Sequence, residues 1–214
     1  MGLVDGFQSP SQPEGIVASP TDEDPFLAKS IELGADKLKV YVFDSLFEKN
    51  TLAGLYNKFR SLTYHLGDYD RDDTQFVKHL VHEFTSEEVQ ATRFLQTIIC
   101  ATRELADTQG IKVRNPVKVY ANFNLYGDYQ FDHEDGDVWT VLVFVNASWD
   151  DDWGGELLLY DGTFAADNDR GFAYAINPRP GRMVIFDGRI KHRGGVPSKF
   201  CLEPRISLAI KFLK

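Results

Sequence analysis

Residues 205–212, RISLAIKF, alternate small or polar residues with branched apolar ones. An extended strand would separate them onto two faces: Arg205, Ser207 and Ala209 on one, and Ile206, Leu208 and Ile210 on the other. An arginine aimed into a protein interior is costly without an anionic partner. A guanidinium can grip a carboxylate through two hydrogen bonds, and a serine hydroxyl can add another. The stretch predicts a strand that backs onto an apolar core and faces a polar, anion-binding cavity.

The same two-residue period appears earlier in the chain. Polar residues face apolar ones in residues 117–126: Lys118, Tyr120, Asn122, Asn124 and Tyr126 oppose Val117, Val119, Ala121, Phe123 and Leu125. Further strand-like runs are separated by clusters of Gly, Pro, Asp and Asn, at residues 138–146, 155–160, 173–177 and 182–186. Many short strands with turn signals between them are typical of an all-β sandwich or barrel.

The residues before about 112 have a different character. A short strand is expected at residues 38–43, and Leu52, Leu55, Tyr56 and Phe59 recur at helix spacing. A second helix is predicted through Phe76, Leu80 and Phe84. Thr85 and Glu88 form a capping-box pattern that opens a third helix, with Leu95, Ile98, Thr102 and Leu105 on one face. Helices followed by strands predict a mainly β jelly-roll core that is buttressed by N-terminal α-helices.

Composition narrows the classes of protein. Residues 1–25 are rich in Gly, Pro, Ser, Gln and Asp and predict a flexible arm, with docking starting near Phe26 and Leu27. Residues 26–214 are expected to form one domain, with strand and helices in 26–112 and the β core in 113–214. A net charge of −9 argues against a dedicated nucleic-acid binder.

Location is judged from segments of the sequence and from its cysteines. No apolar run is long enough to span a membrane, and a secretory signal is not expected at the N-terminus. Two cysteines, Cys100 and Cys201, show no disulfide framework or metal spacing, so a reducing, cytoplasmic location is expected.

The histidines offer one metal-ligand set. His133 and Asp135 lie two residues apart, so both face the same side of an extended segment, and His192 follows a later strand. Two imidazoles and one carboxylate that leave three open positions form the facial triad of non-haem Fe(II) oxygenases. Zinc is the competing metal for such ligands. The alternative is a solvated acidic turn with a surface histidine. The rival pair, His79 and His82, is assigned to ordinary positions on the second helix.

Several motifs resemble those of the Fe(II)- and 2-oxoglutarate-dependent oxygenases, in their prolyl 4-hydroxylase-like branch. Residues 126–135 (YGDYQFDHED) resemble the branch's glycine-to-HxD segment. Residues 146–157 (NASWDDDWGGEL) resemble its N-x-x-W-D…G-G-E-L signature, and residues 176–186 (INPRPGRMVIF) resemble the strand before its distal histidine. With Arg205 and Ser207, the resemblance covers roughly residues 115–213.

The resemblance implies a double-stranded β-helix (cupin-like) fold and a set of site residues. Fe(II) would be bound by His133, Asp135 and His192. The distal carboxylate of 2-oxoglutarate would be held by Arg205 and Ser207, with added contacts from Tyr126, Asn124 or Tyr120. Arg205 follows His192 by more residues than is usual, so Lys199 is a lesser candidate for the cation. O₂ is the other co-substrate, and a need for ascorbate is left open.

The implied reaction is hydroxylation of a C–H bond, with succinate and CO₂ as co-products. Related halogenases replace the carboxylate ligand with a small residue, so Asp135 favours hydroxylation. A prolyl residue in a peptide or protein is the leading substrate, and a free amino acid or other small molecule is the alternative. The acidic loop of residues 68–73 would suit a basic peptide, although a solvated surface loop is the simpler interpretation.

Two rival functions have sequence features that discriminate them. AlkB-like nucleic-acid demethylases share a faint likeness in the last strand. However, they carry a second arginine where this chain has Lys211, and they lack the Gly-Gly-Glu segment. A non-catalytic jelly-roll binding module would have no reason to keep Arg205 and Ser207 facing a metal.

Overall fold

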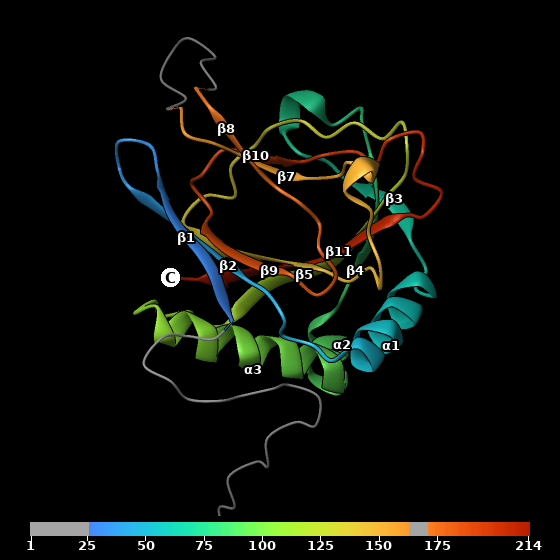
Figure 1. Ribbon diagram of the computed structural model, residues 1–214, viewed down its shortest axis with the longest axis horizontal. Helices are drawn as coiled ribbons and strands as arrows, with labels where there is room; N and C mark the ends of the chain where they lie inside the picture. Colours follow the sequence, from blue (N-terminus) through green and yellow to red (C-terminus); the bar gives the residue numbers. More distant parts are fainter. Residues whose placement is uncertain (1–25, 163–170) are drawn as a thin grey trace, which may run out of the picture.

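Two antiparallel β-sheets face one another in the computed structural model, which describes residues 26–162 and 171–214 (Figure 1). The large sheet has the order β1-β2-β9-β6-β11-β5-β4-β3. Its strands are β1 (Leu27–Leu33), β2 (Leu38–Phe43), β3 (His65–Asp68), β4 (His79–Glu83), β5 (Pro116–Asn124), β6 (Val138–Phe144), β9 (Met183–Asp187) and β11 (Arg205–Leu213). The small sheet, of order β10-β7-β8, contains β7 (Leu157–Tyr160), β8 (Ala173–Ile176) and β10 (His192–Gly194).

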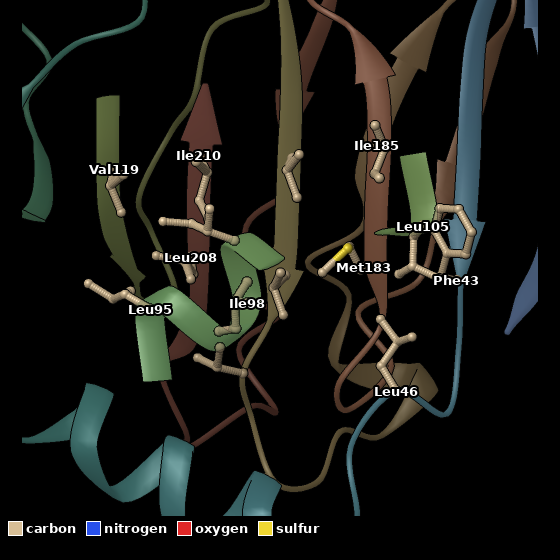
Figure 2. Packing of buried hydrophobic residues seen from close by; sticks show 14 of the residues in the cluster. Phe43, Leu46, Leu95, Ile98, Leu105, Val119, Met183, Ile185, Leu208 and Ile210 are labelled. Atoms are coloured by element: carbon tan, nitrogen blue, oxygen red, sulfur yellow. The ribbon is translucent and has the colours of Figure 1, made fainter. Parts of the chain in front are cut away.

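The helices cover the face of the large sheet that points away from the small sheet (Figure 1). They are α1 (Lys49–Arg60), α2 (Ser86–Ala91) and α3 (Arg93–Thr108), with 3₁₀ turns at Asp72–Thr74 and Asp151–Trp153. The apolar side of α3 packs on the sheet, where Leu95, Ile98 and Leu105 join Met183, Ile185 and Ile210 in one buried cluster (Figure 2). A second cluster fills the space between the two sheets. This is the predicted double-stranded β-helix with supporting helices.

Strand β11 lies in the middle of the large sheet, between β6 and β5. Ile206, Leu208 and Ile210 belong to the cluster beneath the helices, while Ala209 belongs to the cluster between the sheets. The alternation in residues 205–212 was therefore interpreted correctly, and the Arg205 side of the strand faces the interior between the sheets.

The predicted second helix is wrong. Phe76 and Leu80 fit helix spacing, but residues 72–74 form a 3₁₀ turn and His79–Glu83 is strand β4. Val81 pairs with Asn122 of β5 and with His65 of β3, so backbone pairing at the sheet edge overrides the local pattern. His79 and His82 consequently lie on a strand. Strands β1, β3 and β10 were also missed by the sequence patterns.

The capping box at Thr85 is confirmed, because Thr85 Oγ1 accepts from the Glu88 amide while the Glu88 carboxylate accepts from the Thr85 amide. The helix that it opens is shorter than expected. Thr92 adopts φ −96° and ψ 103°, which ends α2 and separates it from α3.

The N-terminal arm predicted for residues 1–25 lies outside the described residues. Phe26 and Leu27 pack against the cluster beneath the helices, as expected. No helix within residues 26–162 or 171–214 is long and apolar enough to cross a membrane. The expectation of a single domain for residues 26–214 stays a prediction.

Candidate active site

A short backbone bridge brings together the three residues of the proposed triad. The amide of His133 donates to the carbonyl of His192 and the amide of His192 donates back, each at 2.9 Å. The amide of Asp135 donates to the carbonyl of Gly188 at 2.7 Å. These bonds hold the segment between β5 and β6 against the start of β10, so residues far apart in the sequence share one site.

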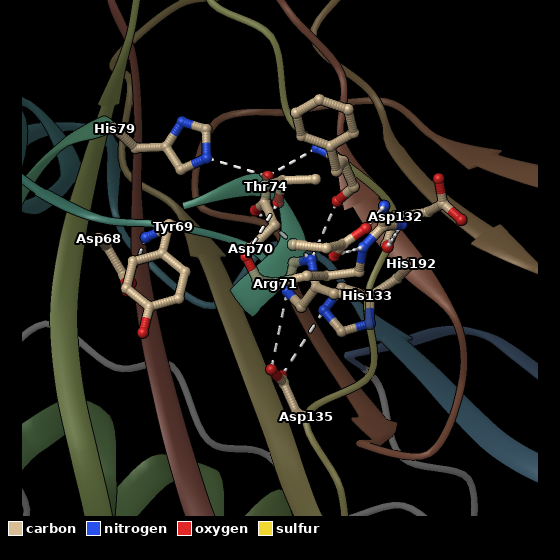
Figure 3. A network of polar contacts seen from close by, with 12 residues as sticks. Asp68, Tyr69, Asp70, Arg71, Thr74, His79, Asp132, His133, Asp135 and His192 are labelled. Carbon is tan, nitrogen blue, oxygen red and sulfur yellow. Dashed lines mark hydrogen bonds and ion pairs between the residues drawn. The ribbon is translucent and has the colours of Figure 1, made fainter. Parts of the chain in front are cut away.

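The three side chains converge on a common point (Figure 3). One ligand atom from each of His133, Asp135 and His192 lies within 4.8 Å of the other two. Asp135 Oδ1 is 3.7 Å from His133 Nε2, and Asp135 Oδ2 is 3.6 Å from His192 Nε2. The Nδ1 atoms face the carbonyls of Phe131 and Ile190, at 3.1 and 2.8 Å. A donor at each Nδ1 leaves the Nε2 lone pairs directed at the shared point.

The protonation states suit a divalent cation. Burial alone would raise the pKa of Asp135, but the neighbouring imidazoles together with the hydrogen bond and charge of Lys211 outweigh it and hold that pKa well below its usual value. Burial, together with the charge of His133, lowers the pKa of His192 to about 4. At neutral pH the carboxylate is therefore ionised and the imidazole is neutral, the forms that bind metals.

Both oxygens of the Asp135 carboxylate have a further partner. Lys211 Nζ, from the cavity side of β11, lies 2.5 Å from Oδ1. Thr140 Oγ1, from β6, donates to Oδ2 at 2.5 Å. These two contacts fix the rotation of the carboxylate, and Lys211 compensates its buried charge.

A cavity of about 230 Å³ opens beside the triad, between the two sheets. Its lining combines polar groups from β5 and β11 with apolar side chains from the strands around them. The lining includes Tyr120, Asn122, Leu142, Leu157, Phe186, Arg205, Ser207 and Ala209. Asp68, Tyr69, Lys118 and Glu134 also line the cavity.

Arg205 is the largest charged group in this interior, and it is only 1% exposed. Its Nε donates to the carbonyl of Gly155 at 2.6 Å, and its Nη1 donates to Asn124 Oδ1 at 3.2 Å. Both acceptors are neutral. Burial lowers the pKa of Arg205 to about 10, so the guanidinium is still charged at neutral pH.

Three buried polar atoms around this guanidinium have no hydrogen-bond partner among the described residues. They are Arg205 Nη2, Ser207 Oγ and Asn124 Nδ2. Buried donors left without a partner cost free energy, so a cluster of them beside a buried cation indicates an anionic ligand. The cavity thus contains two kinds of group: a donor set of two imidazoles and one carboxylate, which suits Fe(II), and unpartnered donors at Arg205, which suit a carboxylate.

The Gly-Gly-Glu segment makes room for the arginine. Gly155 has φ +82°, and a Cβ atom on it would lie 2.9 Å from Arg205 Cδ. Glycine is required here both by the backbone conformation and by the close approach of the side chain. The Gly-Gly-Glu motif therefore leaves the space that the Arg205 side chain occupies.

The other sequence-predicted contacts divide into two groups. Asn124 bonds Arg205, and Tyr120 is buried and lines the cavity. Tyr126 is 65% exposed, because β5 ends at Asn124 rather than continuing to residue 126 as predicted. Lys199, the lesser candidate for the cation, is exposed and its ammonium lies over the ring of Phe200. Neither Tyr126 nor Lys199 is among the residues that line the cavity.

Sequence reasoning gave no site role to Lys211, Thr140, Asp70 or His79. Lys211 was already on the inward face of the alternating strand, which is the signal that could have found it. Asp70 belongs to the acidic loop that was interpreted as solvated, yet its side chain is 7% exposed. His79 is also buried, on β4 instead of a helix, and its Nε2 lies 2.9 Å from Asp70 Oδ2.

The chain is similar to known proteins in part of its sequence and in its fold. Residues 120–212 match the family model described as the 2OG-Fe(II) oxygenase superfamily. These residues, which make up less than half of the chain, are similar to that superfamily. By its description, that superfamily comprises oxygenases that depend on Fe(II) and 2-oxoglutarate. A search of curated proteins by sequence gives no match.

Solved structures resemble the chain in fold at low identity. A prolyl-4-hydroxylase from Pseudomonas putida is 16% identical, with a TM-score of 0.63 over 82% of this chain and 92% of that one. A prolyl hydroxylase from Trichoplax adhaerens, in complex with a hypoxia inducible factor peptide, is 15% identical, with a TM-score of 0.57 over 81% and 83%. An alpha-ketoglutarate-dependent carbocyclase from nogalamycin biosynthesis is 10% identical, with a TM-score of 0.61 over 86% and 80%.

The close approach at Gly155 gives a first prediction. Gly155→Ala should displace the Arg205 side chain and weaken binding of 2-oxoglutarate, besides costing about 1–2 kcal/mol for a left-handed alanine. Gly127→Ala is the matched control, because Gly127 has φ +94° but no atom within 4 Å of an added Cβ. Thermal unfolding and equilibrium binding of 2-oxoglutarate measure the two effects. Equal 2-oxoglutarate affinity in both variants would contradict the role of Gly155 in leaving space for the Arg205 side chain.

The His79–Asp70 pair gives a prediction on pH. Burial opposes the charged imidazole, but the hydrogen bond and charge of Asp70 outweigh it and raise the pKa of His79 above its usual value. The stabilisation from this shift is complete below the unfolded-state pKa, about 6.5, and is lost as pH rises through the folded-state pKa. In denaturant unfolding, the loss of unfolding free energy in His79→Gln relative to the wild type should therefore become smaller from pH 6 to pH 8. A deficit that grows over this range would be the opposite result.

Proposed function

We propose that the protein is an Fe(II)- and 2-oxoglutarate-dependent dioxygenase that hydroxylates a C–H bond. In this proposal His133, Asp135 and His192 hold the metal, and Arg205 with Ser207 binds the distal carboxylate of 2-oxoglutarate. The observation that carries it is the buried, charged Arg205 in the lining of the triad's cavity, where its Nη2 and the hydroxyl of Ser207 both lack a hydrogen-bond partner among the described residues.

The residues of the chain divide the work of binding and orientation. Bound Fe(II), with 2-oxoglutarate and O₂, supplies the oxidising chemistry, and succinate and CO₂ are the co-products. Arg205, held by the Gly155 carbonyl and by Asn124, presents its free nitrogen in a fixed direction, which reduces the entropy lost on binding. Lys211 and Thr140 hold the Asp135 carboxylate in place, and its presence as a third protein ligand favours hydroxylation over halogenation.

The apolar part of the cavity has a separate role. Leu142, Leu157 and Phe186 line it together with the ring of Tyr120. Such a lining excludes water from the reacting groups and strengthens the electrostatic interactions within the site. Tyr69, which lines the cavity and is 39% exposed, could contact an entering substrate.

We propose a prolyl residue in a peptide or protein as the substrate. The support is likeness of fold to two prolyl hydroxylases, one of them bound to a peptide. A small molecule is the second candidate, because a carbocyclase shares the fold with a similar TM-score. The net charge of −9 disfavours nucleic acid. A reducing, cytoplasmic setting fits the two free cysteines.

Removing the positive charge of Arg205 should specifically weaken the binding of 2-oxoglutarate. A hydrogen-bonded carboxylate contact of about 2 kcal/mol corresponds to a factor on the order of 30, so Arg205→Met should raise the KM for 2-oxoglutarate by at least that amount. Lys199→Met, which removes the rival cation at an exposed position, is the matched control and should leave this KM unchanged. Succinate formation at varied 2-oxoglutarate measures both. A larger rise of this KM in Lys199→Met than in Arg205→Met would indicate that Lys199 binds the co-substrate instead.

A substrate panel tests the chemical class. Succinate formation above the uncoupled background should be stimulated by proline-containing peptides, and mass spectrometry of the peptide should show one added oxygen atom. Free amino acids and methylated oligonucleotides belong in the same panel. Stimulation by an oligonucleotide alone would overturn the prolyl assignment and favour the demethylase alternative.

A further inference from the structure

A buried carboxylate lies behind the triad, on the side of His133 that faces away from the shared ligand point. Asp70, from the loop between β3 and the 3₁₀ turn at Asp72–Thr74, places Oδ1 3.5 Å from His133 Nδ1 (Figure 3). Its side chain is 7% exposed, so the charge is shielded from water. A carboxylate at this distance from the outer nitrogen of an imidazole favours a proton at Nδ1 and a lone pair at Nε2.

Asp70 also acts on the same ring through the backbone. Its Oδ2 accepts from the amide of Phe131 at 2.6 Å. The carbonyl of Phe131 in turn lies 3.1 Å from His133 Nδ1. One carboxylate therefore contacts the ring directly and also anchors the residue whose carbonyl is the nearest acceptor of the Nδ1 proton.

His79 fixes the orientation of this carboxylate. Its Nε2 lies 2.9 Å from Asp70 Oδ2, and its side chain is 5% exposed. Strand β4, which carries His79, pairs with β5 through Val81, so the anchor belongs to the large sheet. A chain of three groups, His79, Asp70 and His133, thus links the sheet to the triad.

The other histidine of the triad is held differently. His192 Nδ1 lies 2.8 Å from the carbonyl of Ile190. The carboxylate contact found for His192 is at Nε2, toward Asp135. Among the described residues, a carboxylate behind the ring is thus found at His133 and not at His192, which supplies an internal control.

We propose that Asp70 is a positioning residue for the metal site, which sets the tautomer and orientation of His133 and is itself held by His79. The inference rests on the proposed role of His133 as a metal ligand. It assigns a task to the acidic loop that is independent of substrate charge. Carboxylates behind metal-bound histidines commonly contribute a factor of about 10–100 in metal affinity.

Binding of Mn(II), a stand-in for Fe(II) that does not depend on turnover, tests the proposal directly. The dissociation constant, from the electron paramagnetic resonance signal of free Mn(II), should rise about 10–100-fold in Asp70→Asn. Asp72→Asn is the matched control, since Asp72 is an exposed carboxylate of the same loop, and it should bind as the wild type does. The dissociation constant of His79→Gln, which keeps an amide donor, should lie between those of Asp70→Asn and Asp72→Asn. This variant tests the proposal if Asp70→Asn does not fold.

A spectroscopic readout separates positioning from a general loss of structure. Nitrogen-15 NMR of the metal-free protein should show His133 with its proton at Nδ1 in the wild type. In Asp70→Asn a larger fraction should carry the proton at Nε2, while the signals of His192 stay unchanged. Wild-type metal affinity and tautomer in Asp70→Asn and His79→Gln would overturn the proposal. Failure of the wild-type protein to bind Mn(II) would instead refute the proposed metal site.

Discussion

The buried positive charge of Arg205 is the constraint on which the rest of the site depends. A guanidinium that is 1% exposed and bonded to neutral acceptors calls for an anion within the cavity. The alternation along β11 brings it there, Gly155 allows the chain to pass it, and Asn124 from β5 orients it. The apolar face of the same strand packs on α3, so the core and the cation site come from one two-residue period.

The facing sheets also bring together the proposed metal ligands from separate segments of the chain. The backbone bridge between His133 and His192 joins the β5–β6 connection to the small sheet, and Lys211 extends from the large sheet to Asp135. Each buried carboxylate has a basic side chain next to it: Lys211 contacts Asp135, and His79 contacts Asp70. Distances of 3.6 and 3.7 Å from Asp135 to the two histidines show three ligand atoms already gathered around one point.

The sequence predicted what depends on local periodicity and on motif resemblance. The strands that flank the cavity and the capping box at Thr85 could be predicted because each depends on consecutive or regularly spaced residues. The proposed ligand set came from motif resemblance and stays a prediction. Strand β4 could not, because its apolar residues also fit a helix and its pairing with β5 is non-local. The role of Asp70 was hidden for the same reason: its partners His133 and His79 come from other segments, and an acidic loop read alone is typical of a solvated surface.

The most direct measurement is an anaerobic titration of the Fe(II)-loaded protein with 2-oxoglutarate, followed by visible absorption. We expect the weak charge-transfer band of a 2-oxoglutarate complex, saturating with one equivalent in the wild type and absent in Asp135→Ala. A folded wild-type protein that gives no band, or an Asp135→Ala variant that gives the same band, would contradict it.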